Sequence, residues 1–341
     1  MVHPKIIDVI NNDVCTACGA CASVCPAGAI TIGKAAEIRD PDDLTLYTHG
    51  AAPNVCEGCL TCSRVCPVID GFMEDEFANV TRFFGAKSSI KGQDGGVTTA
   101  IVSALLEKGE IDCVVAIARD DEWGTELVVY TDPEEVKNAK GTKYTYDSVL
   151  SALKEPFDQY EKIAVIGVPC QAHGARMIQE NVNDKIVLII GLLCMESFHH
   201  ETMTEKIIPE ILELNIEDVE KMDFGGGKFW AYTKDGEGHN VPIKNVAPYA
   251  RNPCHHCCDY TSVFADISVG SVGAPDGWNS VFIRNDVGEK YFKMVENDLE
   301  IMDEPKPGMG LVKKLATMKH KNSEHYLEVC EKFSFETNGI R

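Results

Sequence analysis

The sequence predicts three consecutive parts: a small cysteine-rich α+β module over residues 1–76, an α/β domain over residues 81–310 and a helical C-terminal tail over residues 311–341. Three observations support this division. One cysteine run occurs twice in the first part, short apolar runs alternate with helical periodicity in the second, and helical character returns after about residue 311. The acidic residues 73–76 are predicted to form a linker between the first two parts.

The first part contains the runs Cys15-x2-Cys18-x2-Cys21-x3-Cys25-Pro26 and Cys56-x2-Cys59-x2-Cys62-x3-Cys66-Pro67. This spacing is typical of bacterial ferredoxins with two [4Fe–4S] clusters, in which the fourth cysteine of each run binds the other cluster. We therefore expect a ferredoxin-like module with two ligand sets, which are Cys15, Cys18, Cys21 and Cys66, and Cys56, Cys59, Cys62 and Cys25. The alternative is a pair of structural zinc sites, but those usually use two ligand pairs separated by a longer loop.

The composition indicates which partners and which cellular compartment suit the protein. With 53 acidic and 32 basic residues the formal net charge is −21, which repels nucleic acid and anionic lipid and favours solubility or a basic partner. No segment approaches the roughly 20 apolar residues of a membrane span, so no direct membrane insertion is expected. Fifteen cysteines without a signal peptide favour metal clusters in a reducing cytoplasm over disulfides.

The second part reads as alternating strands and helices. We expect a helix after the glycine loop 92–96, with Gly109 as its C-terminal cap, and another helix over 171–180. Nearly continuous apolar runs at 162–167 and 186–193 favour buried parallel strands. Further strands are expected at 113–118, 127–130, 265–270 and 280–284.

Two cysteines follow predicted strands directly. Cys170 and Cys194 lie just past carboxyl ends, at the edge where open α/β sheets bind ligands, and the motif Cys254-His255-His256-Cys257-Cys258 adds a pair at metal-ligand spacing. Our hypothesis is a third [4Fe–4S] cluster held by Cys170, Cys194, Cys254 and Cys257, in which Cys258 could replace Cys257. The alternative is that Cys170 and Cys194 are buried apolar residues, with zinc or nothing at the other pair. Cys113 and Cys330 are expected to be packing residues.

Three loops are candidate binding segments. Gly92-Gln93-Asp94-Gly95-Gly96 opens a helix and suits a phosphate, and Gly141-Thr142-Lys143-Tyr144 offers a turn with a cation and an aromatic ring. The third segment runs from Gly270 to Trp278, whose indole could stack on a planar cofactor. Each could equally be an ordinary turn or packing element. Each cluster carries one electron, whereas a hydride carries two. Oxidation by hydride transfer therefore needs a flavin that accepts both electrons and releases them singly. A flavin-to-cluster converter is therefore a reasonable interpretation.

Five stretches together resemble a known family. Residues 92–100, 141–145, 168–171, 194–198 and 265–278 are similar to the beta subunit of the hydrogenases that reduce coenzyme F420, a deazaflavin, and the similarity extends over about residues 81 to 300. This resemblance implies FAD, a [4Fe–4S] cluster beside it, and hydride exchange between the deazaflavin and the flavin. It implies FAD-binding positions at Gly92, Gln93, Asp94, Gly95, Gly96, Val97, Thr98, Gly141, Thr142, Lys143, Tyr144, Pro169, Gln171, Glu196, Ser197, Ser271, Gly273 and Trp278.

The N-terminal module narrows the resemblance to the electron-input subunits of archaeal F420H2 dehydrogenases, which feed a membrane complex related to respiratory complex I. The hydrogenase beta subunit lacks this module, and the F420-dependent sulfite reductase continues into a sirohaem domain. The resemblance implies a partner that is either such a membrane-bound complex or a soluble iron–sulfur protein, and a peripheral location on the cytoplasmic face. The sequence departs from the family at Cys258, where an acidic residue is expected, so the ligand set stays open between Cys257 and Cys258.

The expected function is oxidation of reduced coenzyme F420 through FAD and three clusters. Lys87, Lys143 and Arg251 are candidates to meet the phosphate and glutamate tail of the coenzyme, although each could be an ordinary surface cation. One alternative is reduction of F420 with electrons from a hydrogenase, formate dehydrogenase or ferredoxin. Others are a non-catalytic electron-carrier subunit and reduction of a different conjugated substrate. Cluster potentials span roughly −700 to +450 mV, so the sequence does not fix the direction.

Overall fold

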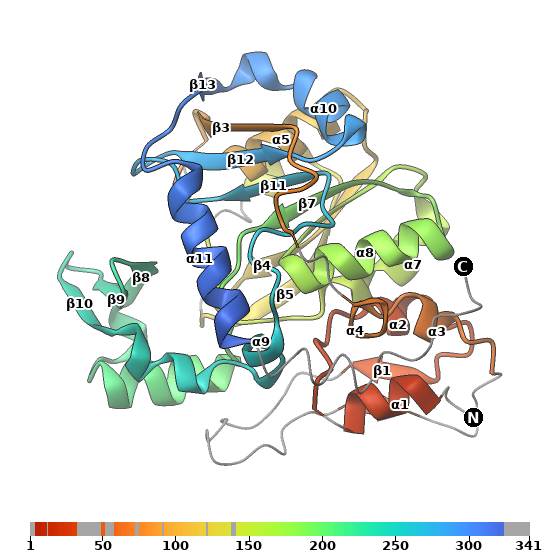
Figure 1. Cartoon of the computed structure of the whole chain (residues 1–341), viewed down its shortest axis with the longest axis horizontal. Coiled ribbons are helices and arrows are strands. Elements are labelled where there is room, and N and C mark those ends of the chain that lie inside the picture. Colours follow the sequence, from red (N-terminus) through yellow and green to blue (C-terminus); the bar gives the residue numbers. More distant parts are fainter. Residues whose placement is uncertain are drawn as a thin grey trace.

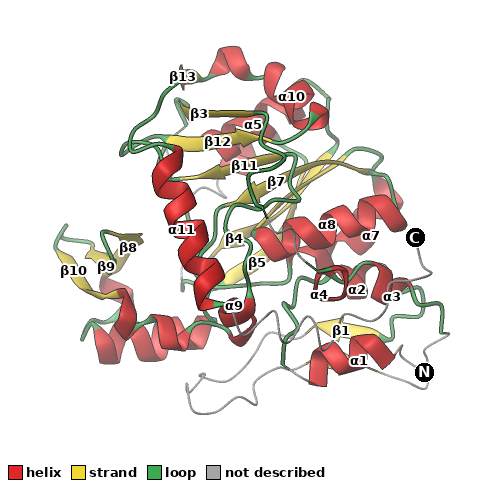
Figure 2. Cartoon of the chain, viewed as in Figure 1, coloured by secondary structure: helices red, strands yellow, loops and turns green. Residues whose placement is uncertain are grey.

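The computed structural model describes residues 4–11, 13–32, 49–51, 58–71, 75–90, 92–120, 122–137 and 141–323. Within these residues, eight strands form a mixed sheet in the order β13-β3-β12-β11-β7-β6-β4-β5 (Figures 1 and 2). The strands are β3 (Arg82–Lys87), β4 (Cys113–Arg119), β5 (Thr125–Tyr130), β6 (Ile163–Gly167), β7 (Ile186–Leu192), β11 (Ile267–Gly270), β12 (Asn279–Ile283) and β13 (Glu300–Met302).

Five of these strands point the same way. β11, β7, β6 and β4 pair in parallel, and β3 shares their direction because β3 and β11 are both antiparallel to β12. The apolar runs of β6 and β7 suit strands that are covered on both faces. Consequently the loops after β3, β4, β6, β7 and β11 leave one edge of the sheet, where open α/β sheets bind ligands.

Helices cover both faces of the sheet. α5 (Val97–Glu107) and α10 (Asp286–Lys293) pack on one face, and α8 (Pro169–Asn181) with the 3-10 segment η2 (Val149–Leu153) on the other. Successive side chains of a strand point to opposite faces of the sheet, as two neighbouring residues of β3 show. Phe84 contacts Phe292 of α10 at 4.9 Å between ring centroids, whereas Phe83 contacts Phe282 on the opposite face, also at 4.9 Å.

The N-terminal module comprises α1 (Pro4–Asn11), α2 (Ala20–Ser23), β1 (Ile30–Ile32), β2 (His49–Ala51), α3 (Thr61–Arg64) and α4 (Pro67–Asp70). It packs against the α8 face (Figure 1). The Leu150 N–H donates to the Cys18 carbonyl at 3.1 Å. A Cβ at Gly174 of α8 would lie 3.2 Å from Cys18 Sγ, so the glycine lets this cysteine approach the helix.

The predicted acidic linker is wrong at its last residue. Glu76 is 3% exposed and accepts hydrogen bonds from the N–H groups of Tyr260 and Thr261, at 2.9 and 2.6 Å. A buried carboxylate needs such partners. Glu76 therefore anchors the chain to the main body, whereas residues 73 and 74 lie outside the described residues.

A smaller antiparallel sheet was not predicted from the sequence. β8 (Val219–Gly225), β9 (Lys228–Thr233) and β10 (Gly238–Pro242) pack with the π-helical η3 (Thr202–Ile211) around their own apolar cluster. The remaining short elements are α6 (Pro133–Val136), α7 (Lys154–Gln159), α9 (Asn252–His256), η4 (Ile216–Asp218), η5 (Ile243–Asn245), η6 (Ala247–Tyr249) and η7 (Glu296–Asp298).

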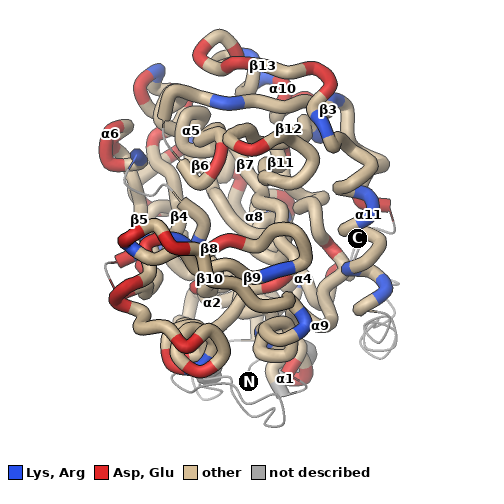
Figure 3. Tube along the Cα trace, turned by 90° about the vertical axis from the view of Figure 1, so that its left-hand side faces the viewer, with Lys and Arg blue, Asp and Glu red and all other residues tan. Residues whose placement is uncertain are grey.

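The segment expected as a helical tail begins with α11 (Met309–Asn322). Val312 and Ala316 of this helix are buried against Tyr260 and Phe282, so α11 belongs to the main body. Figure 3 shows acidic positions on outer turns around α6 and β5 and basic positions along α11. Cys330 lies outside the described residues. Among the helices that are described, none combines the length and apolar character needed to cross a lipid bilayer.

Candidate cluster and cofactor site

The predicted site residues gather at the carboxyl edge of the large sheet. The 92–96 loop follows β3, Cys170 follows β6, Cys194 follows β7 and the 271–278 loop follows β11. Because these strands share one direction, their loops meet although they are far apart in sequence.

The first ferredoxin ligand set is brought together by the fold. Burial raises the pKa of the Cys21 thiol, and the charges of Cys15, Cys18 and Cys66 raise it further. Burial likewise raises the pKa of Cys66, and the charges of Cys15 and Cys18 raise it further. Cys66 of the second run therefore lies near the first three cysteines of the first run, and Cys62 of the second run also acts on Cys21.

The second set is supported in part. The pKa of Cys62 is raised by burial and then by the charges of Cys59 and Cys25, so the fourth cysteine of the first run lies beside the second run. Cys59 is exposed at the surface. Cys56, the remaining predicted ligand, lies outside the described residues.

The third predicted set also converges. Burial raises the pKa of Cys170, and the next cause is the charge of Cys257, with Cys254 contributing as well. Burial raises the pKa of Cys194 to about 12, Lys319 opposes this, and Cys254 and Cys257 add to it. The thiols at the start of α8, in the loop after β7 and at α9 with its C-terminal end thus lie near one another, and the choice between Cys257 and Cys258 as a ligand stays a prediction.

The spacing of these thiols bears on the zinc alternative. Within the described ranges, no three His, Cys, Asp or Glu side chains are arranged to bind a single metal ion. A [4Fe–4S] cluster places each thiolate on a different iron of a cubane, so its ligands surround a larger volume than the ligands of one ion. Four partly buried thiols from separate elements are the donor set that a [4Fe–4S] cluster uses, so the residues present fit the predicted group.

A pocket connects the third set with the N-terminal module. Cys170 and Cys257 line it together with Thr16 and Pro67 of that module and His173 of α8. The charge of Cys18, a ligand of the first set, also acts on Cys170. The third thiol group is therefore the neighbour of the first ferredoxin set.

Arg251, which was predicted as a candidate to bind the coenzyme, is buried inside the protein. It is 2% exposed, its Nη2 donates to the Thr16 carbonyl at 2.8 Å, and its guanidinium covers the Tyr146 ring at 3.4 Å. Its charge lowers the pKa values of Cys18 and Cys170. Arg251 lies inside the protein between the two thiol groups, and sequence reasoning missed this because arginines are usually exposed.

The glycine loop is tightly enclosed. Gly96 is the N-cap of α5 with φ of 65°, and a Cβ there would lie 2.1 Å from the Ile90 carbonyl oxygen. A Cβ at Gly95 would lie 2.7 Å from the Ala86 carbonyl oxygen. Gly96 has no side chain to cap the helix, so the backbone N–H groups of its first turn are suited to an anion. Val97 N–H donates to Asn279 Oδ1 at 3.3 Å, and the Gln93 amide donates to the Met222 carbonyl at 3.0 Å.

The turn at 141–144 and the glycine loop approach each other around β8. Tyr144 Oη lies 3.5 Å from Asp223 Oδ1. The pKa of Asp94 is raised to about 6, first by burial and then by Asp223 and Asp276. All three candidate loops therefore face one region. Asp223 was missed by sequence reasoning, because nothing in the sequence indicated the small sheet.

A pair of cations lies beside this region. The pKa of Lys143 is lowered to about 8, first by burial and then by the charge of Arg119. Arg119, which sequence reasoning missed, ends β4 and stacks at 3.9 Å over the Trp123 ring. The rule that ligands bind at carboxyl edges could have identified it. Lys87 ends β3, with Nζ 3.0 Å from Glu300 and 4.8 Å from the centroid of the Trp278 ring.

Several other residues that were predicted to bind the cofactor pack inside the fold or lie beside the third thiol group. Gln171 is 1% exposed; its Oε1 accepts from the Val168 N–H and its Nε2 donates to the Asp147 carbonyl. A Cβ at Gly273 would lie 2.7 Å from Val312 Cγ2 of α11. Pro169 is the first residue of α8 and Val97 the first of α5, and both are buried.

Two predicted positions lie beside the third thiol group. Ser197 Oγ is 3.6 Å from Cys254 Sγ. Burial raises the pKa of Glu196 to about 7, and Lys319 opposes this. By contrast, Gly92, Gly141, Thr142 and Ser271 are exposed and Thr98 is half-buried, so their backbones remain accessible at the same edge.

Comparison with known proteins agrees with this arrangement. Residues 84–154 and 160–307 match the N-terminal and C-terminal models of the coenzyme F420 hydrogenase/dehydrogenase beta subunit, and residues 14–69 match a 4Fe-4S dicluster domain. One of the subunits of the F(420)H(2) dehydrogenase of Methanosarcina mazei is 67% identical over 99% of this chain and 98% of its own length.

Two further similarities cover smaller parts of the chains. The beta subunit of the coenzyme F420 hydrogenase of Methanococcus voltae is 41% identical over 69% of this chain and 87% of its own length. A chain of the F420-reducing [NiFe] hydrogenase complex of Methanosarcina barkeri superposes with a TM-score of 0.71 at 35% identity, covering 75% of this chain and 94% of that chain. The chain belongs to the coenzyme F420 hydrogenase/dehydrogenase beta-subunit family, with a 4Fe-4S dicluster domain at its N-terminal side.

Proposed function

We propose that this chain oxidises reduced coenzyme F420 and passes the electrons singly, by way of three [4Fe–4S] clusters, to a partner complex. The names of its relatives support coenzyme F420 as the substrate and an F420H2 dehydrogenase as the complex. The observation that carries the proposal is the position of Cys170, whose thiol is influenced both by Cys257 of the third group and by Cys18 of the first ferredoxin set. This proximity supports a continuous series of cluster sites from the sheet edge to the N-terminal module.

FAD, when bound at the sheet edge, would accept one hydride, which carries two electrons, and release these electrons singly to the clusters. The residues present fit such a cofactor. Gly95 and Gly96 let the loop pack closely on Ala86 and Ile90, which fixes the start of α5, and the helix N-terminus favours a phosphate. Asp94 and Tyr144 approach the same part of β8 from two different loops, because the charge of Asp223 acts on both.

The cations at this edge suit an anionic coenzyme. Lys143 and Arg119 carry two like charges close enough to lower the pKa of Lys143, a repulsion that a bound phosphate or carboxylate would relieve. Lys87 offers a third cation, which is held in place by Glu300 and Trp278. We infer that Lys87, Lys143 and Arg119 orient the charged part of the coenzyme, whereas Arg251 serves the clusters.

The exit from the series would lie at the second ferredoxin set. Cys59 is exposed, unlike the buried Cys18 and Cys66 of the first set. A short distance to the surface suits electron transfer to another protein, so we infer that the partner is met on the side of Cys59. A cytoplasmic location, peripheral on a membrane complex, follows from the same proposal.

The test is anaerobic reconstitution of the full chain with FAD, iron and sulfide, followed by mixing with reduced F420 and an artificial one-electron acceptor. Appearance of the oxidised deazaflavin spectrum that depends on FAD would support the proposal. Absence of turnover in both directions, with the clusters and FAD bound, would reject the deazaflavin as substrate. Failure to bind FAD at all would favour a non-catalytic electron carrier, and redox titration against the coenzyme would decide the direction.

A further inference from the structure

The basic helix α11 carries a buried lysine. Four lysines lie on α11, of which Lys313, Lys314 and Lys321 are exposed, whereas Lys319 is 4% exposed. A lysine is almost never fully buried unless its charge is paired. This helix begins at Met309, beyond the residues 160–307 that match the family model.

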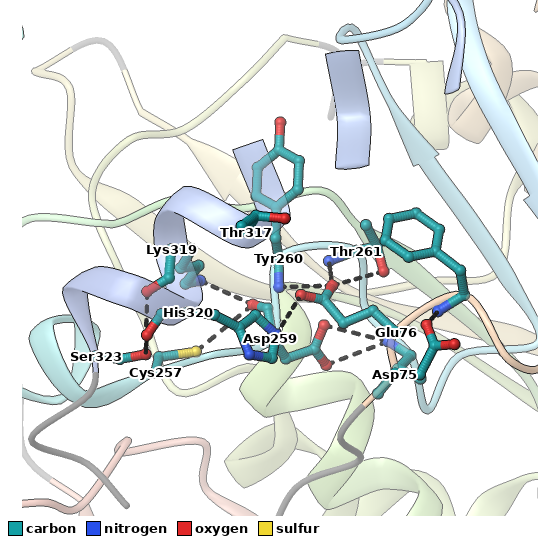
Figure 4. Close-up of polar contacts among 12 residues, drawn as sticks. Asp75, Glu76, Cys257, Asp259, Tyr260, Thr261, Thr317, Lys319, His320 and Ser323 are labelled. Carbon is teal, nitrogen blue, oxygen red and sulfur yellow. Dashed lines mark hydrogen bonds and ion pairs between the residues drawn. The ribbon is translucent and has the colours of Figure 1, made fainter. Parts of the chain in front are cut away.

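The ammonium group of Lys319 joins two loops that carry thiols of the third group. Its Nζ donates to the Cys194 carbonyl at 2.7 Å and to the Asp259 carbonyl at 2.8 Å (Figure 4 shows the second contact). Cys257 Sγ lies 3.6 Å from the same Asp259 oxygen. One buried cation therefore touches the backbone of one predicted ligand and the turn that holds another.

The thiols of the third group act on Lys319. Burial alone lowers the pKa of Lys319, but the charges of Cys257, Cys194 and Cys254 outweigh it and leave the pKa above its ordinary value. In return, Lys319 lowers the pKa values of Cys194 and Cys257.

The nearby carboxylates have other partners. Asp259 accepts the Ser262 N–H at 2.7 Å and the Val263 N–H at 3.1 Å. Glu76 is bound by Thr261 and by His320, whose Nε2 lies 3.1 Å away (Figure 4). Lys319 is thus more than a counter-ion for Asp259, because its ammonium points to the two carbonyls beside the thiols.

We propose that Lys319 is a positioning residue that keeps a fixed positive charge beside the third [4Fe–4S] cluster and raises its reduction potential. This inference rests on the third cluster of the proposed function. Reduction adds one electron to a cluster that four thiolates already make negative, and cluster potentials depend on net charge and hydrogen bonding. A buried cation stabilises the more negative, reduced form through a Coulomb attraction that water screens only weakly.

The test compares three substitutions in the reconstituted full-length chain. Lys319→Met removes charge and donor, Lys319→Gln keeps a donor without charge, and Lys319→Arg keeps the charge. Lys314→Met is the matched control, because it removes the same charge from an exposed position on the same helix. Iron content is measured first, and an electron paramagnetic resonance titration then gives the midpoint potential of each cluster. The signal that disappears in a Cys194→Ser variant identifies the third cluster.

We expect the two neutral variants to shift the one-electron equilibrium of the third cluster about tenfold toward the oxidised form, equivalent to 59 mV. The ferredoxin clusters, Lys319→Arg and Lys314→Met should keep the wild-type potentials. Wild-type potentials in both neutral variants would overturn the proposal, as would an equal shift in Lys319→Arg.

If a variant is too unstable for a redox titration, the number of clusters that it retains still tests the proposal. Loss of the third cluster in both neutral variants, with retention in Lys319→Arg, would support the need for charge. Loss in all three variants would show that only the shape of lysine matters and would overturn the proposal. Wild-type protein that holds only about eight irons would instead remove the third cluster itself, a failure of the proposed function that is separate from the role of Lys319.

Discussion

The guanidinium of Arg251 lies 3.4 Å from the centroid of the Tyr146 ring, and Tyr146 Oη lies 3.7 Å from Cys170 Sγ. On its other side, Arg251 donates to the Thr16 carbonyl of the N-terminal module. A stacked cation in a desolvated site contributes about 2 kcal/mol. These two side chains therefore link the third thiol group to the first ferredoxin set both by packing and by charge.

Replacing Arg251 by methionine should slow electron delivery to the ferredoxin clusters. The variant loses a positive charge near Cys18 and Cys170, so the reduced clusters on both sides lose stabilisation. It also leaves the Thr16 carbonyl unpaired, which should lower the free energy of unfolding by about 1–3 kcal/mol. Stopped-flow bleaching of the clusters by reduced F420, together with urea unfolding, measures the two effects.

Arg82→Met is the matched control. Arg82 also covers an aromatic ring, Phe84, at 5.0 Å, but it lies on β3 and pairs with Glu289 and Glu296 instead of facing thiols. Its loss should affect stability without changing the rate of cluster reduction. Equal cluster reduction rates in Arg251→Met and wild type would contradict the assigned role.

The third ligand set predicts different outcomes for two adjacent cysteines. Cys257 shares its electrostatic environment with Cys254 and Lys319, and its thiol acts on Cys170 and Cys194. We expect Cys257→Ser to lower the iron content from about twelve to about eight atoms per chain, whereas Cys258→Ser keeps about twelve. Iron and sulfide analysis after anaerobic reconstitution checks this, and the reverse result would assign Cys258 as the ligand.

Coenzyme binding should depend on pH through Lys143. Its pKa of about 8 means that the side chain is cationic at lower pH and loses its charge as the pH rises through 8. Binding of the anionic coenzyme should therefore weaken above about pH 8, by roughly fivefold for an ion pair of about 1 kcal/mol. KM for reduced F420 as a function of pH measures this.

Lys143→Met should show the weaker binding at every pH, without this transition. Lys137→Met is a suitable control, because Lys137 is paired with Glu134 on α6. A transition that persists in Lys143→Met would assign the pH dependence to another group.

The sequence predicted the parts of the molecule that depend on local pattern. The apolar runs at 162–167 and 186–193 became β6 and β7, and α5 begins at Val97, directly after the glycine loop, as expected. The doubled run also placed Cys66 near Cys15 and Cys18, whereas the crossed ligand pattern itself stays a prediction. Strand direction then placed the candidate loops at one edge.

What the sequence did not predict depends on tertiary contacts. Lys319 and Glu76 lie in segments that were predicted to be a tail and a linker, because charged residues in polar surroundings normally indicate exposure. Only the packing of α11 and the path of the chain before β3 bury them. The burial of Arg251 between two thiol groups is a tertiary effect of the same kind.

The glycine loop allows a comparison between the two ends of one helix. Gly96 before α5 and Gly109 after it have nearly the same backbone conformation, with φ of 65° and 67°. Alanine in this left-handed region costs about 1–2 kcal/mol at either position. The surroundings differ, because a Cβ at Gly96 would lie 2.1 Å from the Ile90 carbonyl oxygen, whereas nothing lies within 4 Å of a Cβ at Gly109.

Gly96→Ala should therefore displace the loop and weaken FAD binding, while Gly109→Ala should retain FAD and lose only the conformational energy. Flavin content after reconstitution and gel filtration, with thermal unfolding as the measure of stability, separates the two effects. Equal flavin content in both variants at equal stability would show that the start of α5 does not hold the cofactor. Loss of flavin in Gly96→Ala alone would place the phosphates at this helix, because backbone strain is common to both variants and crowding of the loop is not.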